Sequence, residues 1–186
     1  MYEDIVKHYP DFPKPGIDFI DVLPFLHDKA VFRQAICAID EMCTAPNVAT
    51  VEARGFLFSA PLLTVSDHVD TVVPIRKKGK LPYAEGDLRK VTIEKEYGSD
   101  EVYYRLSDLA AAVPTGDCIE LTLLDDLLAT GGTAMGIAQS LQNELVDGKK
   151  VRVKEFVFLV ELPDLKGRQL LETIAPVRSL LQVEGA

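Results

Sequence analysis

Short apolar runs alternate along this chain with segments of helical length. Residues 48–51 and 71–75 are two such runs, and the segment GFLFSAPLLTV (residues 55–65) between them has helical length in spite of its internal Pro61. A second unit passes from a strand at residues 118–124, through a helix at about 133–145, to a β-branched strand at 151–160. Strands that alternate with helices predict an α/β fold with a mainly parallel sheet and right-handed crossovers.

Two further segments carry clear element signals. Asp28 is positioned to cap a helix, because apolar residues recur after it at the three-and-four spacing of one buried face: Phe32, Ala35, Ile36, Ile39 and Met42. Residues 91–97 and 101–106 flank the turn sequence Gly98-Ser99-Asp100 and predict an antiparallel hairpin. Such a hairpin projects from the parallel sheet and is able to cover a site.

Length, charge and cysteine content limit the class of protein. The chain has 186 residues, of which 47% are hydrophobic, enough for the core of one domain spanning residues 1–186. Its formal net charge of -9 opposes attraction to nucleic-acid phosphates and to anionic lipid, so we expect neither a nucleic acid nor a membrane as partner. The three cysteines lack CxxC spacing and do not suit a disulfide framework, so we expect a cytoplasmic protein.

The strongest chemical signal is the segment LLDDLLATGGT, residues 123–133. Asp125 and Asp126 follow an apolar run, so both carboxylates fall at the C-terminal end of a strand, where open parallel sheets bind ligands. The glycines allow a tight turn with converging N–H groups, and the N-terminus of the following helix adds positive potential, which suits a phosphate dianion. The carboxylates can accept hydrogen bonds from neutral sugar hydroxyls. Phosphate and diol together indicate a site for ribose 5-phosphate.

Simpler interpretations of these residues also exist. The aspartates could merely cap a loop while the glycines make a turn. A Walker-type phosphate loop is excluded because no GxxxxGK[ST] pattern occurs. His8, His27 and His68 are scattered without acidic or cysteine partners at ligand spacing, so we expect neither metal ligands nor nucleophiles among them.

The segment LLDDLLATGGT resembles the ribose-phosphate motif of the type I phosphoribosyltransferases. Further segments resemble the adenine-specific members of that family: PDFPKPGIDF near the N-terminus, VEARGFLFSAP at 51–61, IRKKGKLP at 75–82, EYGSD at 96–100 and VELPDLKGR at 160–168. The resemblance extends from about Tyr9 to Val183. It implies the type I phosphoribosyltransferase fold, a mainly parallel twisted sheet flanked by helices, with a small N-terminal hood at about residues 1–25 and a projecting hairpin or flexible loop.

The resemblance also implies a reaction. In this purine-salvage reaction the 5-phosphoribosyl group passes from phosphoribosyl pyrophosphate to adenine, giving AMP and pyrophosphate. The implied cofactor is Mg²⁺, held mainly by phosphoribosyl pyrophosphate and water, and the implied assembly is a homodimer. Two alternatives stay open: a phosphoribosyltransferase for another purine, and a non-catalytic regulator of the same fold that senses nucleotide or phosphoribosyl pyrophosphate.

Particular residues receive roles from the same resemblance. It assigns Arg54 to the pyrophosphate, Glu96 to the proton at the purine imidazole edge, and Asp126 to the ribose, as the catalytic residues. It also implies a cis peptide between Glu52 and Ala53. The implied substrate-binding residues are Asp18, Phe19 and Ile20 for the base, Arg76, Lys77 and Lys80 near the pyrophosphate, Tyr97 for closure of a lid, and Asp125, Asp126, Ala129, Thr130, Gly131, Gly132 and Thr133 for the ribose phosphate.

The chain departs from the family pattern at Ile20, at Thr50 and Ser59, where glycine is common, and in the strand that enters the aspartate pair, which residues 118–122 make about two residues longer than expected. Ile20 stands where arginine is usual, which keeps the choice of purine open to the alternatives above. Glu120 and Thr122 alternate with apolar neighbours and predict one wetter face at the start of the strand that leads to the aspartate pair.

Overall fold

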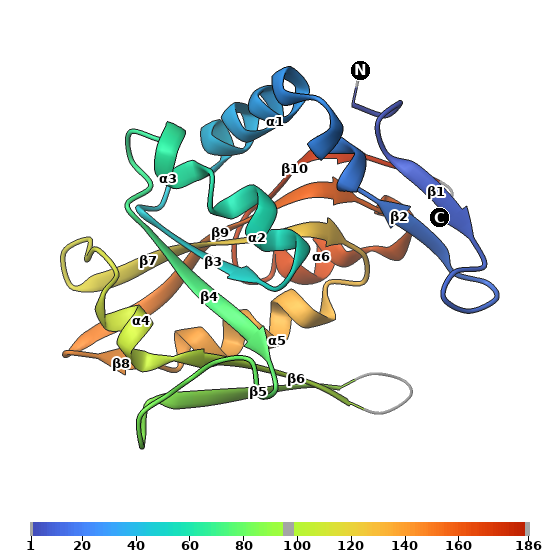
Figure 1. The fold of residues 1–186 in the computed structure, drawn as a ribbon. Coiled ribbons are helices and arrows are strands. Elements are labelled where there is room, and N and C mark those ends of the chain that lie inside the picture. Colours follow the sequence, from blue (N-terminus) through green and yellow to red (C-terminus); the bar gives the residue numbers. More distant parts are fainter. Residues whose placement is uncertain (1, 95–98, 185–186) are drawn as a thin grey trace.

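The computed structural model describes residues 2–94 and 99–184. Its main element is an eight-stranded sheet in the order β10-β9-β7-β3-β4-β6-β5, with β8 paired to β9 (Figure 1). Five of these strands run parallel: β3 (Asn47–Val51), β4 (Thr71–Lys77), β7 (Cys118–Leu128), β9 (Lys149–Glu161) and β10 (Val177–Gln182). The predicted mainly parallel α/β sheet is therefore confirmed.

The remaining strands of this sheet are antiparallel to their neighbours. β5 (Leu88–Glu94) and β6 (Ser99–Arg105) pair with each other, and β6 continues the sheet by pairing with the end of β4. The predicted antiparallel hairpin is confirmed, but Ser99 and Asp100, expected in its turn, belong to β6 and pair with β5. β8 (Leu145–Val146) folds back on β9 through Asp147 and Gly148, whose φ angles of 49° and 78° are those of a tight hairpin turn.

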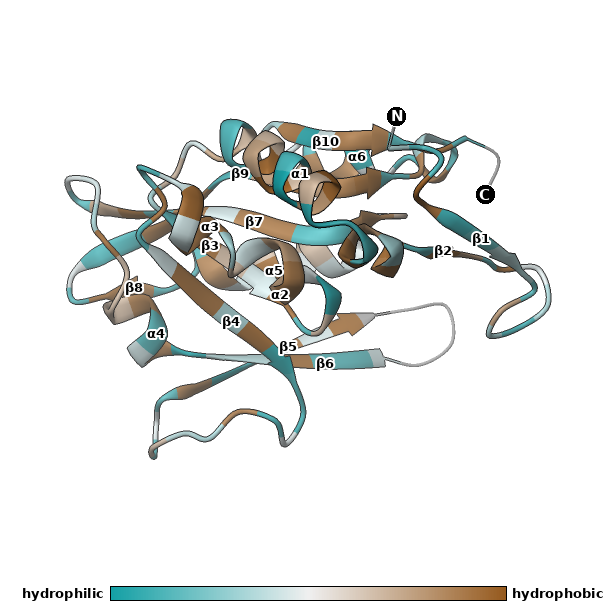
Figure 2. Cartoon of the chain, turned by 45° about the horizontal axis from the view of Figure 1, so that its top comes forward, coloured by the Kyte–Doolittle hydropathy of each residue, from teal (hydrophilic) through white to brown (hydrophobic). Residues whose placement is uncertain are grey.

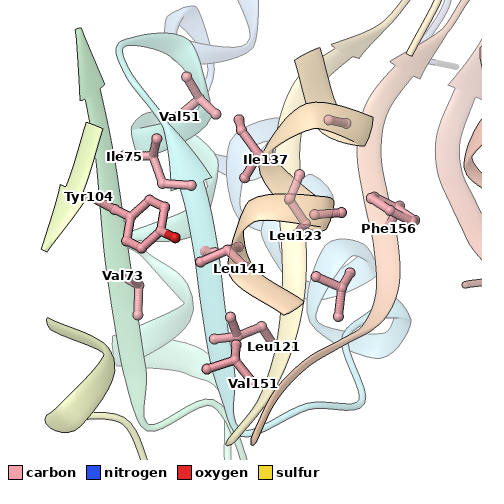
Figure 3. Packing of buried hydrophobic residues seen from close by; sticks show 14 of the residues in the cluster. Val51, Val73, Ile75, Tyr104, Leu121, Leu123, Ile137, Leu141, Val151 and Phe156 are labelled. Carbon is pink, nitrogen blue, oxygen red and sulfur yellow. The ribbon is translucent and has the colours of Figure 1, made fainter. Parts of the chain in front are cut away.

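Helices cover both faces of the sheet (Figure 1). The core on one face includes α1 (Lys29–Met42), α2 (Arg54–Ser59) and α3 (Leu62–Val65). The core on the other face includes α4 (Leu106–Ala110), α5 (Gly132–Gln142) and α6 (Gly167–Leu171). Because successive strand residues point to opposite faces, Leu123 is buried in the core with α5 and Leu124 in the core with α1. Figure 3 shows Ile137 and Leu141 of α5 beside Leu121 and Leu123 of β7.

The cap and the buried face of α1 agree with their prediction. Asp28 Oδ1 accepts hydrogen bonds from the backbone N–H groups of Ala30 (2.7 Å) and Val31 (3.1 Å). These bonds satisfy two of the N–H groups that a helix leaves unpaired at its start. The buried face consists of Ala35, Ile36 and Ile39, with Phe32 and Met42 partly buried against the same core.

A separate two-stranded sheet lies within the predicted hood. β1 (Lys7–Pro10) and β2 (Asp18–Asp21) pair antiparallel, and the 3₁₀ helix η1 (Leu23–His27) follows. β1 is exposed and largely hydrophilic (Figure 2), whereas Ile20 of β2 is buried. None of the helices in the described part of the chain is long and apolar enough to cross a membrane.

Several element boundaries differ from those predicted, and three of the differences affect the site or its surroundings. The strand expected at 118–124 continues to Leu128, because residues 127 and 128 remain paired with β9. The helix expected at 133–145 spans Gly132–Gln142, since Leu145 belongs to β8. The segment 55–65 forms two short helices that meet at Pro61, whose missing N–H cannot continue a helix.

The prediction of a wetter face at Glu120 and Thr122 is wrong. Glu120 is 8% exposed and Thr122 is fully buried. The pairing of β7 with β9 shifts at this point: Leu121 pairs with Val153 and Thr122 with Glu155, so Lys154 is the extra residue of a β-bulge. The polar residues therefore face partners on other segments rather than water.

Candidate active site

The loop after β7 encloses a small cavity. Residues 127–134, together with Asp125 and Phe158, line a space of about 130 Å³. Gly131 has a φ of 80° and precedes α5 as its N-cap, so glycine allows the chain to turn from strand to helix. The N-terminus of the eleven-residue α5 adds positive potential at the same place. The structure thus brings the five predicted loop residues of the ribose-phosphate site to one cavity: Ala129, Thr130, Gly131, Gly132 and Thr133.

Asp125 and Asp126 lie in β7 beside this loop. Asp126 is 6% exposed, and its backbone N–H donates to the Asp125 carboxylate at 2.9 Å. Burial raises the pKa of Asp125 well above its ordinary value, and the neighbouring carboxylate of Asp126 raises it further. Burial also raises the pKa of Asp126, but the adjacent Arg54 opposes that shift. The cation therefore favours the charged form at Asp126.

Arg54, in the first turn of α2, connects the aspartate pair with the hood. Its Nε lies 2.8 Å from Asp126 Oδ2, and its Nη1 donates to the carbonyl oxygen of Ile20 at 3.1 Å. Its guanidinium carbon lies 5.1 Å from the centroid of the Phe19 ring, a cation–π distance. The Phe12 ring meets Phe19 edge-on, with the ring centroids 5.2 Å apart. Predicted base-recognition and ribose-recognition residues thus meet at one guanidinium, whereas contact of Arg54 with pyrophosphate stays a prediction.

The basic segment 76–80, at the end of β4 and just after it, borders a neighbouring cavity. Arg76 Nε donates to Glu52 at 2.5 Å, and Arg76 Nη1 donates to the carbonyl of Lys80 at 2.8 Å. Lys77 lines a cavity of about 240 Å³ together with Thr133 of the phosphate loop and residues of the β5–β6 hairpin. Thr133 lines both cavities, so the basic segment, the phosphate loop and the hairpin adjoin one another.

Two predicted residues lie outside the described part of the chain. Glu96 and Tyr97 fall between β5 and β6, in the segment 95–98, and their roles stay predictions. The flanking hairpin residues Ile93 and Val102 line the cavity that contains Lys77. The described strands of the hairpin thus border the same cavity as Lys77 and Thr133.

The turn that carries Arg54 approaches Asp125 closely. The peptide between Glu52 and Ala53 is cis, as the resemblance implied. A Cβ on Gly55 would lie 2.6 Å from Thr50 Oγ1 and 3.0 Å from Asp125 Oδ1. Glu52, the partner of Arg76, was not among the predicted site residues, although it lies in the same sequence motif as Arg54.

Two of the three histidines have hydrogen-bonding or ion-pair partners near the surface. His8 Nδ1 lies 2.6 Å from an Asp18 carboxylate oxygen, and His68 Nε2 lies 2.7 Å from the carbonyl oxygen of Cys43. His27 is exposed at the end of η1. Within residues 2–94 and 99–184, no group of three or more His, Cys, Asp and Glu side chains could by itself hold a metal ion.

One family model matches part of the chain. The model is described as the BRCC36 C-terminal helical domain, and the match covers residues 1–58, less than half of the sequence. This segment contains the strands β1, β2 and β3 and is not a helical domain. The match therefore does not assign the family.

Relatives that align over nearly the whole chain are of a different kind from the partial match. The chain is 36% identical over 188 residues to the adenine phosphoribosyltransferase of Rhizobium meliloti (strain 1021), covering 97% of this chain and 93% of the relative. It is 38% identical over 185 residues to the adenine phosphoribosyltransferase of a Picosynechococcus strain, covering 97% and 98% of the two chains.

Solved structures agree with these relatives. The crystal structure of adenine phosphoribosyltransferase from Thermoanaerobacter pseudethanolicus matches with a TM-score of 0.78 and 33% identity, covering 97% of both chains. The enzyme from Saccharomyces cerevisiae, solved with an imino-altritol bisphosphate and adenine, matches with a TM-score of 0.76 and 32% identity, covering 96% and 95% of the two chains. The chain therefore belongs to the adenine phosphoribosyltransferase family.

Proposed function

We propose that this chain transfers the 5-phosphoribosyl group from phosphoribosyl pyrophosphate to adenine, giving AMP and pyrophosphate. The observation that carries the proposal is the cavity lined by residues 127–134 together with the half-buried Asp125, directly beside the buried Asp126. Relatives and solved structures similar to the whole chain bear the name adenine phosphoribosyltransferase, and the yeast enzyme was solved with adenine.

The ribose 5-phosphate part of the substrate fits the loop after β7. Its phosphate lies against residues 129–133 and the N-terminus of α5, where backbone N–H groups and hydroxyls donate hydrogen bonds. The carboxylates of Asp125 and Asp126 accept hydrogen bonds from the ribose hydroxyls. Arg54 holds the Asp126 carboxylate in place for this contact.

The base is recognised at the hood. The purine stacks on Phe19, and the backbone of Asp18 and Ile20 distinguishes a 6-amino group from a 6-oxo group. A carbonyl oxygen can accept two hydrogen bonds. The carbonyl oxygen of Ile20 can therefore accept one from the 6-amino group of the base in addition to the one from Arg54. Because the backbone makes these contacts, an aliphatic side chain at position 20 is compatible with adenine.

The reaction breaks the bond between ribose C1′ and a pyrophosphate oxygen, and forms a bond between C1′ and a purine imidazole nitrogen. The leaving pyrophosphate is met by basic side chains of the site: Arg54, Arg76, Lys77 and Lys80. Glu96 accepts the proton that the purine nitrogen loses, and Tyr97 closes with the hairpin over the substrates to exclude water.

We also propose Mg²⁺ as cofactor, carried mainly by the phosphate oxygens of the substrate and by water. Asp125 lines the cavity and offers carboxylate oxygens, the donor type that suits this ion, to its water ligands. Bound there, the ion neutralises pyrophosphate and orients the sugar hydroxyls.

The assembly and compartment are further parts of the proposal. We expect one domain over residues 1–186, with the hood at about 1–25. We also expect a homodimer. Light scattering during gel filtration tests the assembly, and the mass of a monomer would contradict the expected homodimer. The free thiols of Cys37, Cys43 and Cys118 suit a reducing cytoplasm. The net charge of -9 disfavours a nucleic acid or a membrane as partner.

A panel of bases tests the proposal. Adenine, hypoxanthine, guanine and xanthine are each supplied with phosphoribosyl pyrophosphate and magnesium, and pyrophosphate release is followed. We expect adenine to give the highest kcat/KM. Equal or better use of a 6-oxopurine would point to another purine substrate, and binding of phosphoribosyl pyrophosphate without any release of pyrophosphate would point to a regulator of the same fold.

A further inference from the structure

The ribose-phosphate loop packs against a second stretch of backbone, the turn in which the 3₁₀ helix η2 (Pro163–Leu165) passes into α6 and which includes Gly167, the first residue of α6. A Cβ on Gly167 would lie 2.2 Å from the carbonyl oxygen of Ala129 and 3.0 Å from the backbone nitrogen of Gly131. In the other direction, a Cβ on Gly131 would lie 3.1 Å from the carbonyl oxygen of Gly167. The two backbones are thus in direct contact, with no room for a side chain between them.

Glycine is needed at position 167 for space and not for backbone conformation. Gly167 has no left-handed φ, unlike Gly131, so alanine can adopt its backbone angles. The nearest atom to an added Cβ is a backbone oxygen, which cannot rotate away as the end of a side chain can. Since ordinary contact begins near 3.4 Å, the Ala129 carbonyl would have to move by about 1 Å.

The turn that carries Gly167 is held firmly, so the loop is the part that yields. The N–H of Leu162 donates to the carbonyl of Leu128 at 2.9 Å. Arg168 Nε donates to the Glu161 carboxylate at 2.9 Å, and its Nη1 donates to the carbonyl of Val177 at 2.6 Å. These bonds join the turn to β7, β9 and β10.

We propose that Gly167 is a positioning residue for phosphoribosyl transfer: its bare Cα sets the path of residues 129–131 and thereby the geometry of the phosphate cavity. The inference rests on the proposed function, in which that cavity receives the 5-phosphate of phosphoribosyl pyrophosphate. Gly167 lies against the loop from outside, while the base is recognised at the hood. A side chain at position 167 should therefore impair the binding of phosphoribosyl pyrophosphate and leave the binding of adenine unchanged.

The test is the variant Gly167→Ala, with kinetics measured separately for each substrate. A misplacement of about 1 Å at a reacting site costs roughly 10²-fold, so we expect kcat/KM for phosphoribosyl pyrophosphate to fall by about that factor. The KM for adenine should change by less than about twofold, because the hood is untouched. An unchanged KM and kcat for phosphoribosyl pyrophosphate, or an equal rise in both KM values, would overturn the inference.

Gly148→Ala is the matched control. Gly148 lies in an exposed turn with a φ of 78°, and an added Cβ there would meet nothing within 4 Å. Its alanine variant is strained without touching the site, so it should lose thermal stability and keep both KM values.

Arg168→Lys is the variant to use if Gly167→Ala does not fold. It loosens the same turn while keeping the positive charge at position 168. It should raise the KM for phosphoribosyl pyrophosphate alone, and unchanged KM values would again overturn the inference.

Calorimetric titration with ribose 5-phosphate separates this inference from the proposed function. If the wild type binds ribose 5-phosphate but releases no pyrophosphate with any purine, the proposed function fails while weaker binding by Gly167→Ala still supports the inference. Equal binding by wild type and variant overturns the inference alone. Absence of ribose 5-phosphate binding to the wild type overturns the inference, whereas the proposed function is decided by pyrophosphate release in the base panel.

Discussion

Asp126 and Arg54 form the residue contact that joins the parts of the site. The carboxylate is buried at the end of β7, and the guanidinium that faces it at 2.8 Å also reaches the carbonyl of Ile20 and the ring of Phe19. Burial raises the pKa of Asp126 and Arg54 opposes that shift. Arg54 thus favours the charged form of an acceptor for the ribose hydroxyls that lies in a largely buried position.

Replacing Asp126 by asparagine should lower activity without unfolding the protein. The amide keeps the shape of the carboxylate but loses the charge-assisted hydrogen bonds, each of which contributes roughly 1.5–3 kcal/mol. We expect kcat/KM to fall roughly 10- to 100-fold, measured by pyrophosphate release, with an unchanged circular dichroism spectrum. Kinetics equal to wild type would remove Asp126 from the site.

The pairing itself is tested by a double-mutant cycle of Arg54→Gln and Asp126→Asn. Because each single change already breaks the contact, the loss in the double variant should be smaller than the sum of the two single losses. Residues in contact commonly couple by about 0.5–3 kcal/mol. If the free-energy losses calculated from kcat/KM for the two single variants add up to that of the double variant within about 0.3 kcal/mol, Arg54 acts independently of Asp126, for example only on pyrophosphate.

At the scale of elements, local patterns predicted the types of the strands and helices better than their ends. β7 was expected to stop before Asp125, because an acidic pair followed by glycines is typical of a loop. It continues because Leu127 pairs with Val160 and Leu128 with Glu161 of β9. These partners are distant in sequence and leave no local signal.

In the site, too, contacts within one sequence motif could be predicted and contacts between distant segments could not. Residues 125–133 were found because the whole phosphate loop is one continuous motif. The contact of Gly167 with Ala129 was not found, because it joins two segments through backbone packing that a sequence pattern does not encode. Glu52 was also missed, since its pairing with Arg76 depends on how β3 and β4 lie side by side.

The cap of α1 gives a prediction about an element alone. Asp28→Ala removes the oxygen that accepts from the N–H groups of Ala30 and Val31, which should cost about 1 kcal/mol of unfolding free energy. For a chain of this size the melting temperature should fall by roughly 2–4 °C. Thermal unfolding checks this against Gln34→Ala on the exposed side of the same helix, which should change little. A loss equal to that of the control would mean that the cap adds nothing, and a loss of activity in Asp28→Ala would be unexpected.

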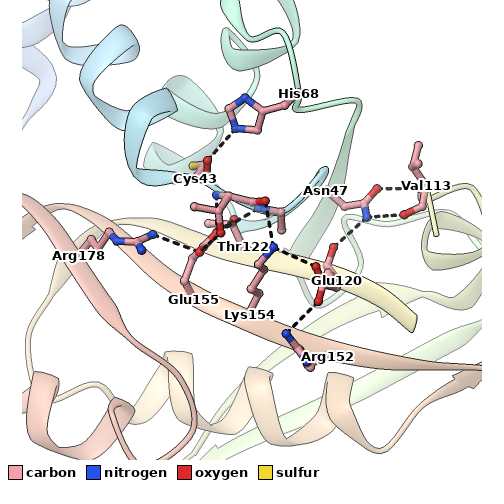
Figure 4. Close-up of polar contacts among 12 residues, drawn as sticks. Cys43, Asn47, His68, Val113, Glu120, Thr122, Arg152, Lys154, Glu155 and Arg178 are labelled. Carbon is pink, nitrogen blue, oxygen red and sulfur yellow. Dashed lines mark hydrogen bonds and ion pairs between the residues drawn. The ribbon is translucent and has the colours of Figure 1, made fainter. Parts of the chain in front are cut away.

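At the scale of the whole molecule, the buried carboxylate of Glu155 accepts hydrogen bonds from segments that are far apart in sequence (Figure 4). Glu155 of β9 is 2% exposed. It accepts hydrogen bonds from the backbone N–H of Thr44 before β3 (2.6 Å), from the hydroxyl of Thr122 in β7 (2.5 Å) and from Arg178 of β10 (3.2 Å). Sequence alternation identified Thr122 as polar but not its partners, so a buried network was mistaken for a wet face.

These contacts decide the protonation of Glu155. Burial by itself would raise the pKa of this carboxyl, but the hydrogen bonds from Thr122, Thr44 and Ala45 outweigh it and leave the pKa below the ordinary value of 4.5. A carboxylate whose pKa is lower in the folded state stabilises the fold at neutral pH. That contribution is lost as the pH falls from 4.5 through the folded-state pKa.

Glu155→Gln should therefore destabilise the protein most at neutral pH. An amide has one accepting oxygen where the carboxylate has two, so some of its buried donors lose their acceptor, at a cost of roughly 1–3 kcal/mol. Urea unfolding at pH 7 should show this difference from wild type, and the difference should shrink as the pH is lowered below 4.5, because glutamine does not titrate. Glu120→Gln is the control: its partners Arg152 and Lys154 are partly exposed and can turn to water, so its effect should be smaller. A difference for Glu155→Gln that stays constant between pH 7 and pH 4 would show that shape, and not charge, is what this residue contributes.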